Sequence, residues 1–260
     1  MTTHPTVPER SAVDRTLRIL SAFDRHNQIL TLSEISRRSG LPVATAHRIV
    51  TKLHRLGVLG RTTDGRYGIG IRLWEAGTLA PRSSLVSEIA QSSLVDLHNQ
   101  TSAVALLVIR DGDESVCVSF VSRDPGHATA PGALGRRRPL HTTAMGLVLL
   151  AHTSAATGGE PGSGAPPAAG AGDPALQRRL AGIRRQGYAV AAGTPSPNVG
   201  GLAAPVRDAQ GEVVAGVGVM THIHAFQQLQ LVSPVLAAAA AVSQGIQAFS
   251  GRDRTLDPPA

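Results

Sequence analysis

Basic and hydroxyl side chains gather on one face of a predicted helix between Pro42 and Leu56. At about 100° per residue, the apolar residues of this stretch fall on the opposite face and must pack against the rest of the fold. They are Ala46, Ile49, Val50, Leu53 and Leu56. Arginine can donate two parallel hydrogen bonds to guanine or bind a phosphate. We therefore expect nucleic-acid contacts from Ala44, Thr45, His47, Arg48, Thr51, Lys52 and Arg55.

Arg48 is the central candidate, because it lies near the end of the helix that would enter a major groove. The small side chain of Ala44 permits close approach, and Thr45 and His47 can reach base edges or phosphates. Lys52 and Arg55 lie further along the helix, where phosphates are the closer targets. A basic helix face that is merely solvated is the alternative.

Two helices are predicted before this one. The first runs from Ser11 to about Arg25. The second opens at a capping box formed by Thr31 and Glu34, and Gly40 ends it. Three short helices in this order are typical of a helix-turn-helix domain.

A hairpin is predicted directly after the third helix. Its strands are Val58–Arg61 and Arg66–Ile71, and the Asp64-Gly65 pair between them is a strong turn signal. Helices and hairpin together predict a winged helix-turn-helix domain over residues 11–72. The wing would bring Arg61 and Arg66 to the DNA backbone or the minor groove.

The charge distribution favours a polyanionic partner for this first domain. Residues 1–82 hold thirteen basic and six acidic residues, whereas residues 83–260 hold twelve of each. The whole net charge of +7 therefore lies in the first third of the chain. An Arg-rich composition without a function is the alternative.

The rest of the chain predicts an α+β domain over residues 83–250, reached through a connecting helix at 73–82. Residues 153–174 are rich in Gly, Pro and Ala, so we expect a disordered insertion there. Residues 1–10 and 251–260 are expected to be flexible tails. The expected helices are Leu85–Leu97, Thr142–His152, Leu176–Gln186 and Ala225–Phe249, and the expected strands are Ala103–Ile109, Ser115–Val121, Tyr188–Ala191, Leu202–Val206 and Glu212–Met220.

A candidate ligand site lies where the segment from Gly135 to Gly146 runs into a helix N-terminus. Free backbone N–H groups and the helix dipole at such a point favour an anion or a carbonyl oxygen. Thr142 and Thr143 either cap the helix or touch a ligand. For the basic run Arg136–Arg138 we expect a solvated surface.

Other chemistry has weak signals. His222 and His224 alternate at a strand end without a nearby acid or cysteine, so no metal site is expected. The single cysteine, Cys117, excludes an intrachain disulfide and is expected to be a passive thiol in a strand. The chain has no nucleophile elbow, Walker loop or H-E-x-x-H motif, so we expect neither an enzyme nor a cofactor.

The chain has no run of about 18 apolar residues, and its first 30 residues are too charged for a secretory leader. We therefore expect a cytoplasmic protein without a membrane partner.

These motifs resemble the IclR family of bacterial transcriptional regulators. The resemblance rests on LSEISRRSGLPVATAHRIVTKLHRLGVLGRTTDGRYGIG at 32–70, GRRRPLHTTAMG at 135–146, IRRQGYAV at 183–190 and GGLAAPVRDAQGEVVAGVGV at 200–219. It covers about residues 11–249 apart from the insertion. It implies a winged-helix domain, a connecting helix that helps dimerise, and a GAF-like domain whose small-molecule effector tunes binding to a palindromic operator.

The resemblance also places the effector between the 141–146 loop and the strands around 200–220. Family members that bind small acids offer thiol, hydroxyl or carboxylate groups where this chain has Gly201, Gly218, Met220 and Ala191 or its neighbours. The two glycines should also leave space, so an apolar or aromatic effector is expected. Backbone N–H groups near Thr142–Ala144 would anchor it. The implied contacts are His141, Thr142, Thr143, Ala144, Met145, Asn198, Gly201, Gly218, Met220, Thr221 and His222.

A symmetric homodimer is the smallest expected DNA-binding unit, and two dimers could pair. Trp74 and Leu73 on the connecting helix are candidates for the dimer seam. An enzyme with an appended helix-turn-helix, a DNA binder whose second domain only dimerises, and a vestigial pocket remain the alternatives.

Overall fold

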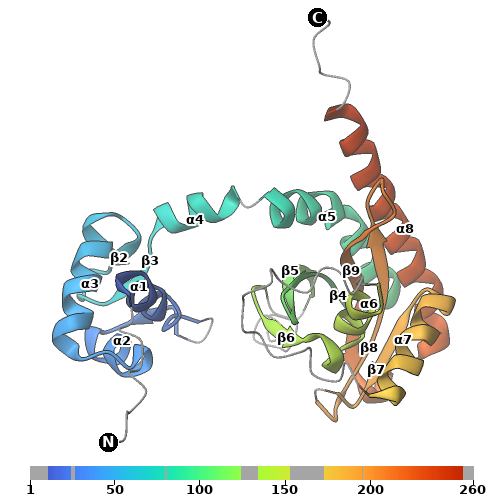
Figure 1. The fold of residues 1–260 in the computed structure, drawn as a ribbon, viewed down its shortest axis with the longest axis horizontal. Coiled ribbons are helices and arrows are strands. Elements are labelled where there is room, and N and C mark those ends of the chain that lie inside the picture. Colours follow the sequence, from blue (N-terminus) through green and yellow to red (C-terminus); the bar gives the residue numbers. More distant parts are fainter. Residues whose placement is uncertain are drawn as a thin grey trace, which may run out of the picture. The chain divides into compact units, whose positions relative to one another are not determined.

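The computed structural model describes residues 11–24, 27–79, 81–123, 134–152, 173–194 and 196–253 (Figure 1). The chain divides into two compact units, residues 1–80 and 81–260. The expected tail at 1–10 lies outside the described residues, as do 153–172 of the expected insertion and 254–260 of the expected second tail.

The first unit has the winged helix-turn-helix architecture expected from the sequence. Its small antiparallel sheet has the strand order β1-β3-β2. Ile19, Ile35, Val50 and Leu59 are almost completely buried in one apolar core. The elements are α1 (Ala12–Leu20), β1 (Ile29–Leu30), α2 (Leu32–Ser39), α3 (Val43–Arg55), β2 (Leu59–Arg61), β3 (Tyr67–Ile69) and α4 (Ile71–Thr78).

Local signals define the ends of α2. The capping box is confirmed: the Thr31 hydroxyl accepts a hydrogen bond from the Glu34 backbone N–H at 3.3 Å, and the Thr31 N–H donates to the Glu34 carboxylate at 2.8 Å. The hydrogen bonds from Thr31 lower the pKa of the Glu34 carboxyl. Gly40 ends the helix at φ +63°, a left-handed conformation that favours glycine.

Several features of this unit differ from the sequence expectation. The first helix ends at Leu20 rather than Arg25, because the backbone turns at Ser21. The two-residue strand β1 was not expected, since its only partner is the distant strand β3. Helix α4 also begins at Ile71, two residues before the expected connecting helix, and α5 begins separately at Pro81.

The second unit is built on a six-stranded antiparallel sheet with the strand order β6-β5-β4-β9-β8-β7. This confirms the expected α+β class. The elements are α5 (Pro81–Thr101), β4 (Val104–Asp111), β5 (Glu114–Val121), β6 (Arg137–Pro139), the 3₁₀ turn η2 (Leu140–Thr142), α6 (Ala144–His152), α7 (Pro174–Gln186), β7 (Ala189–Ala192), β8 (Val199–Arg207), β9 (Val213–His222), the 3₁₀ turn η4 (Ile223–Ala225) and α8 (Gln228–Asp253).

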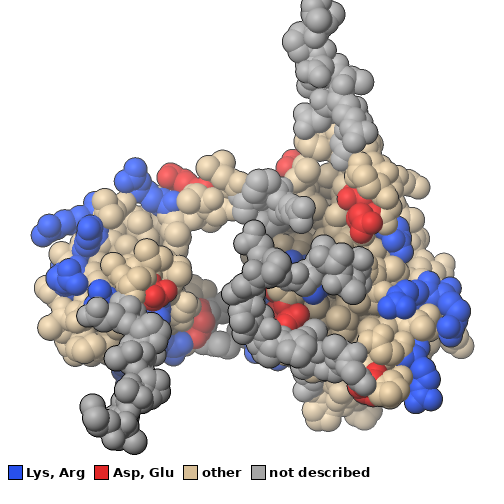
Figure 2. Space-filling view, in the orientation of Figure 1, with Lys and Arg blue, Asp and Glu red and all other residues tan. Residues whose placement is uncertain are grey.

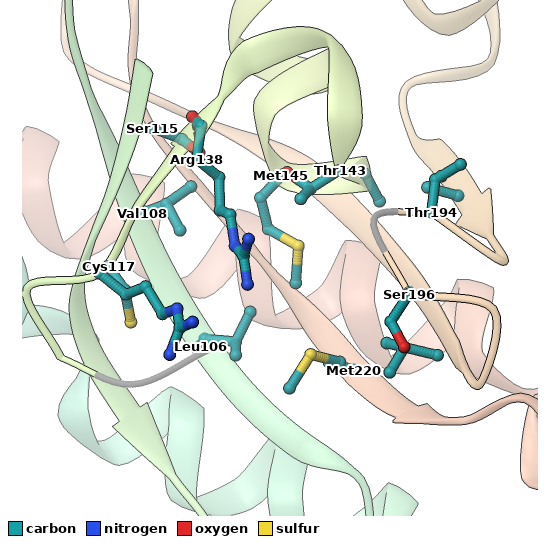
Figure 3. A pocket seen from close by; sticks show the side chains of 15 residues that line it. Leu106, Val108, Ser115, Cys117, Arg138, Thr143, Met145, Thr194, Ser196 and Met220 are labelled. Atoms are coloured by element: carbon teal, nitrogen blue, oxygen red, sulfur yellow. Dashed lines mark hydrogen bonds between the residues drawn. The ribbon is translucent and has the colours of Figure 1, made fainter. Parts of the chain in front are cut away.

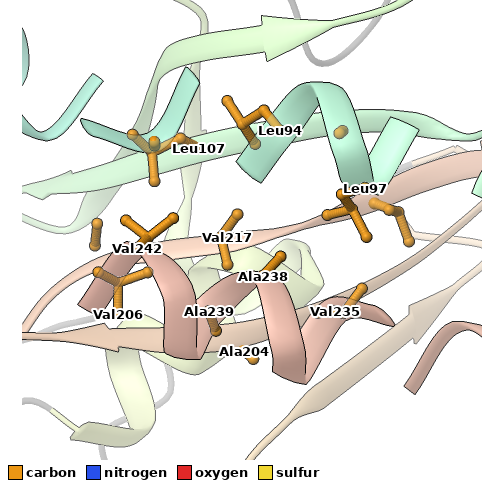
Figure 4. Close-up of a cluster of buried hydrophobic side chains, with 14 of the residues drawn as sticks. Leu94, Leu97, Leu107, Ala204, Val206, Val217, Val235, Ala238, Ala239 and Val242 are labelled. Atoms are coloured by element: carbon orange, nitrogen blue, oxygen red, sulfur yellow. The ribbon is translucent and has the colours of Figure 1, made fainter. Parts of the chain in front are cut away.

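Helices cover both faces of this sheet. One face packs against α5 and α8 and buries Leu107, Val217 and Val206 beneath Leu94 and Val242 (Figure 4). The other face packs against α6 and α7 in a second apolar cluster. Because neighbouring residues of a strand point to opposite faces, each long strand contributes to both clusters.

Helix α8 is the one described helix that is long and apolar enough to cross a membrane, over Gln228–Phe249. Its apolar residues are interrupted by Gln and Ser, so the sequence contains no unbroken apolar run here. In this fold 33% of that window is buried, and Val235 and Val242 are fully buried in the core shared with the sheet. The apolar residues of α8 that pack against the sheet explain the composition of this helix.

Several expected boundaries in the second unit are wrong. Helix α5 runs over Pro81–Thr101 instead of Leu85–Leu97, and α8 begins at Gln228 instead of Ala225. The helix expected from Thr142 begins at Ala144, because residues 140–142 form a 3₁₀ turn. Asp173 and Pro174 belong to α7 rather than to an insertion, since the Asp173 side chain caps that helix and Pro174 is its first residue. Residues 251–253 continue α8 instead of starting a tail.

Two glycines of β9 provide a stability test. A Cβ atom at Gly218 would lie 2.2 Å from the Leu202 carbonyl oxygen on the neighbouring strand, whereas one at Gly216 would meet nothing closer than 3.4 Å. We expect Gly218→Ala to lower the free energy of unfolding by about 1–3 kcal/mol, because the strands must separate. Gly216→Ala should lower the free energy of unfolding by clearly less. Urea unfolding of both variants measures the two losses in the free energy of unfolding, and equal losses would contradict the prediction.

Candidate functional site

Helix α3 presents a cationic face to solvent. Ala46, Val50 and Leu53 are buried on its inner side, as the periodicity predicted. Leu56 departs from that prediction: it lies just after the last helical residue and is 48% exposed. The outer side lines a shallow groove formed by His47, Arg48, Thr51, Lys52, Arg55 and Leu56.

The cations of this face have no counter-ion among the residues that the structure describes. Arg48, Lys52 and Arg55 are exposed, and none forms an ion pair with another described residue. Figure 2 shows Lys and Arg side chains gathered at the edge of the first unit where α3 lies. Unpaired guanidinium and ammonium groups on an exposed helix are available to bind phosphates and base edges.

The turn before α3 exposes the N-terminal end of that helix. After Gly40, Leu41 is buried as an anchor, and Pro42 precedes the first helical residue. Ala44 is exposed and Thr45 is half-buried, so both lie beside the solvent-facing start of the helix. These positions match the part of a recognition helix that enters the major groove.

The wing arginines differ in their surroundings. Arg66 is already paired, since its Nε lies 2.7 Å from the Asp64 carboxylate. A hydrogen bond from the Thr62 hydroxyl and the bond from Arg66 lower the pKa of Asp64. The Arg61 guanidinium instead lies 5.5 Å from the centre of the Tyr67 ring and has no ion pair among the described residues. Arg61 is therefore the freer of the two wing cations.

A cavity opens in the second unit between α6 and the sheet (Figure 3). Its space is about 610 Å³ including the opening to solvent. Most of its walls are apolar. Ser115 lies beside Arg138, and Thr194 and Ser196 lie on the opposite side (Figure 3). It is lined by Leu106, Val108, Ser115, Cys117, Arg136, Arg138, Thr143, Ala144, Met145, Ala191, Thr194, Ser196, Val199, Gly201 and Met220.

Five of the eleven effector contacts suggested by the family resemblance line this cavity. They are Thr143, Ala144, Met145, Gly201 and Met220. Thr143 also caps α6, because its hydroxyl accepts a hydrogen bond from the Gly146 N–H at 3.0 Å. The N-terminus of α6 therefore forms one wall of the cavity, and the capping and ligand-facing interpretations of Thr143 are compatible.

The other six residues lie elsewhere. His141 and Asn198 are exposed, and the Thr142 hydroxyl donates to the Pro139 carbonyl at 2.7 Å. Thr221 and His222 line a separate hollow near the ends of β5 and β9. Gly218 leaves no space for a ligand, contrary to the sequence expectation, because the backbone of β8 occupies the position of its missing side chain.

The arginine run beside the cavity was assigned to a solvated surface, and this holds only in part. Arg137 points outward from β6 and pairs with Glu114 at 2.6 Å and Asp111 at 2.7 Å. Arg138, which is half-buried, and Arg136, which is exposed, also line the cavity. Burial and the neighbouring Arg136 lower the pKa of the Arg138 guanidinium. Alternation along a strand is the signal that could have found them, but three residues are too few to reveal a strand in the sequence.

For His222, His224 and Cys117 we expect a structural role. The rings of His222 and His224 stack with centroids 5.1 Å apart. Within the part of the chain that the structure describes, no group of three or more His, Cys, Asp or Glu side chains could hold a metal. Cys117 is buried in β5 as expected, but it also lines the cavity.

Comparisons with known proteins cover both units. The profile described as "IclR helix-turn-helix domain" matches residues 12–62, and "Bacterial transcriptional regulator IclR C-terminal" matches residues 81–244. The HTH-type transcriptional regulator XynR of Escherichia coli is 30% identical over 221 residues, which are 83% of this chain and 87% of XynR. The Pca regulon regulatory protein of Pseudomonas putida is 26% identical over 238 residues, 88% of this chain and 81% of that protein.

A solved structure is similar over nearly the whole chain. It is an IclR homologue of Microbacterium hydrocarbonoxydans complexed with 4-hydroxybenzoate. The two folds agree with a TM-score of 0.78 at 26% identity, over 92% of this chain and 100% of the other.

Proposed function

Because this chain belongs to the IclR family of bacterial transcriptional regulators, we propose that it binds a palindromic operator as a dimer under the control of a small, largely apolar effector. Membership makes it a regulator with a DNA-binding and an effector-binding domain, and not an enzyme. The unpaired cationic face of α3 is the observation that carries the proposal. Such a regulator works in the cytoplasm, where its operator is.

The DNA contacts follow from where each side chain leaves α3. Arg48 reads a base edge, with Thr45 and His47 beside it, while Ala44 lets the helix approach closely. Thr51, Lys52 and Arg55 face the flanking phosphates. Arg61 on the wing contributes more than Arg66, because Asp64 already neutralises part of the Arg66 charge.

The effector occupies the cavity beneath α6. Leu106, Val108, Met145 and Met220 offer an apolar surface that suits a ring or a short hydrocarbon body. The aromatic ligand named for the Microbacterium homologue supports this choice, since that protein has the same fold. Thr143 and the start of α6 supply polar groups at one wall.

A second copy of this chain is the proposed partner of the α4 patch, which consists of Ile71, Trp74 and Leu79. These side chains are 63%, 63% and 78% exposed on a single chain. Helix α1 of the same unit also exposes Val13 and Leu17. Large exposed apolar side chains gathered in so small a domain favour an interface. A two-fold dimer also explains how a domain that reads a few base pairs acquires specificity.

Selection of random or genomic DNA fragments by the purified protein tests the function. We expect the enriched fragments to share an inverted repeat whose half-sites lie about 10–10.5 base pairs, or a multiple of that distance, apart. Operator release is then titrated with a panel of aromatic compounds. If the enriched fragments share no sequence, the protein binds DNA non-specifically, which would contradict the proposal. Specific binding that no compound changes would contradict only its effector part.

A further inference from the structure

One side of the cavity in the second unit is cationic, because the half-buried Arg138 and the exposed Arg136 both line it. Arg138 projects from β6 toward Leu106 and Met145, whereas Thr194 and Ser196 lie on the opposite side (Figure 3). Arg136 lines the same cavity. The register explains this placement: on β6, which pairs with β5, Arg137 points away from the cavity, so its neighbours point into it.

Neither guanidinium group forms an ion pair with another residue that the structure describes. No Asp or Glu is among the described residues that line the cavity, and the acids nearest in sequence, Asp111 and Glu114, bind Arg137 outside it. The Arg138 Nε atom is buried without a hydrogen-bond partner in the described structure. A buried donor on a charged group is costly unless an acceptor satisfies it.

We infer that the effector carries one carboxylate, and that Arg138 binds this group with Arg136 as a second donor. The inference rests on the proposed function and specifies the ligand of the same cavity. A guanidinium offers parallel donors that match a carboxylate. The effector's apolar body then lies against Met145 and Met220, and a hydroxyl at its far end meets Ser196 or Thr194.

This arrangement differs from the anchor that the sequence suggested. Backbone N–H groups at the start of α6 would donate hydrogen bonds to any acceptor, charged or neutral. An arginine pair instead selects for charge, because a neutral amide has one acceptor oxygen, turns an N–H donor toward the guanidinium groups and leaves their charge uncompensated. A second carboxylate on the ligand would meet only hydroxyl groups at the far side, so a monoanion fits better than a dianion.

Matched ligands and one matched variant test the inference by calorimetric titration. The probes are benzoate, the hydroxybenzoates and phenylacetate, beside the corresponding amides and phenyl phosphate. We expect at least one acid to bind, and its amide to bind at least about tenfold more weakly. Arg138→Gln should weaken acid binding by about 10- to 100-fold and leave amide binding unchanged. Arg137→Gln removes one charge from the outer side of the same strand and should not alter acid binding.

Ligand-free stability gives a second readout. Because Arg138→Gln removes an unpaired charge from the cavity, the midpoint of thermal unfolding without ligand should stay unchanged or rise, which also verifies folding. Amides that bind as well as acids, phenyl phosphate that outcompetes every acid, or an Arg138→Gln variant with unchanged affinity would overturn the inference while leaving the proposed function intact. A panel that is silent throughout would overturn the aromatic effector of the proposed function as well.

Discussion

Replacing Arg48 by alanine is expected to weaken operator binding by about 1–3 kcal/mol, or roughly 5- to 150-fold in Kd. The Arg48 side chain is exposed on α3, has no ion pair among the described residues and lines the groove of the cationic face. If it donates to a guanine, the loss is confined to the cognate sequence. Gel shifts on the operator and on a scrambled duplex, at one stated salt concentration, measure the effect.

The controls separate base reading from phosphate binding. Lys52→Ala should weaken binding to both duplexes similarly and reduce the salt dependence by about one charge. Arg178→Ala removes an exposed helical arginine from α7 in the second unit and should change neither. If Arg48→Ala weakens binding to the operator and to scrambled DNA equally, Arg48 contacts a phosphate. No weakening would remove it from the site.

Placing a glutamate at Trp74 is expected to raise the dimer dissociation constant at least about 30-fold, the size of a 2 kcal/mol interface hot spot. Trp74 is 63% exposed in a single chain and belongs to the α4 patch. A charge there should therefore destabilise the monomer little and the dimer interface strongly. Sedimentation velocity over a micromolar concentration series measures the change, and binding to a full operator should fall with it.

A matched substitution controls for the surface charge. Leu229 on α8 is 89% exposed, so Leu229→Glu makes the same kind of change in the second unit and should leave the dimer intact. Wild-type protein that sediments as a monomer, or a Trp74→Glu variant that dimerises as well as the wild type, would contradict the assignment of the α4 patch to a second copy.

Most of the first unit could be predicted from the sequence because its signals are local. The Thr31 capping box, Gly40 and the spacing of Ala46, Val50 and Leu53 each act within one or two turns of helix. The side of α3 that faces solvent follows from that spacing alone. The sequence thereby determined which residues of α3 face solvent. The end of α1, the start of α4 and the strand β1, which depends on a distant partner strand, were not predicted.

The tertiary structure decided the chemistry of the cavity. Arg136, Arg137 and Arg138 are identical in type and adjacent in the chain, and only the pairing of β6 with β5 sends one to the acids outside and two to the cavity. From the sequence, Gly218 is likewise expected to leave space for a ligand, although the backbone of the neighbouring strand fills that space. In both cases the direction of a side chain depends on strand register, which residues far apart in the chain define together and which no short stretch of sequence contains.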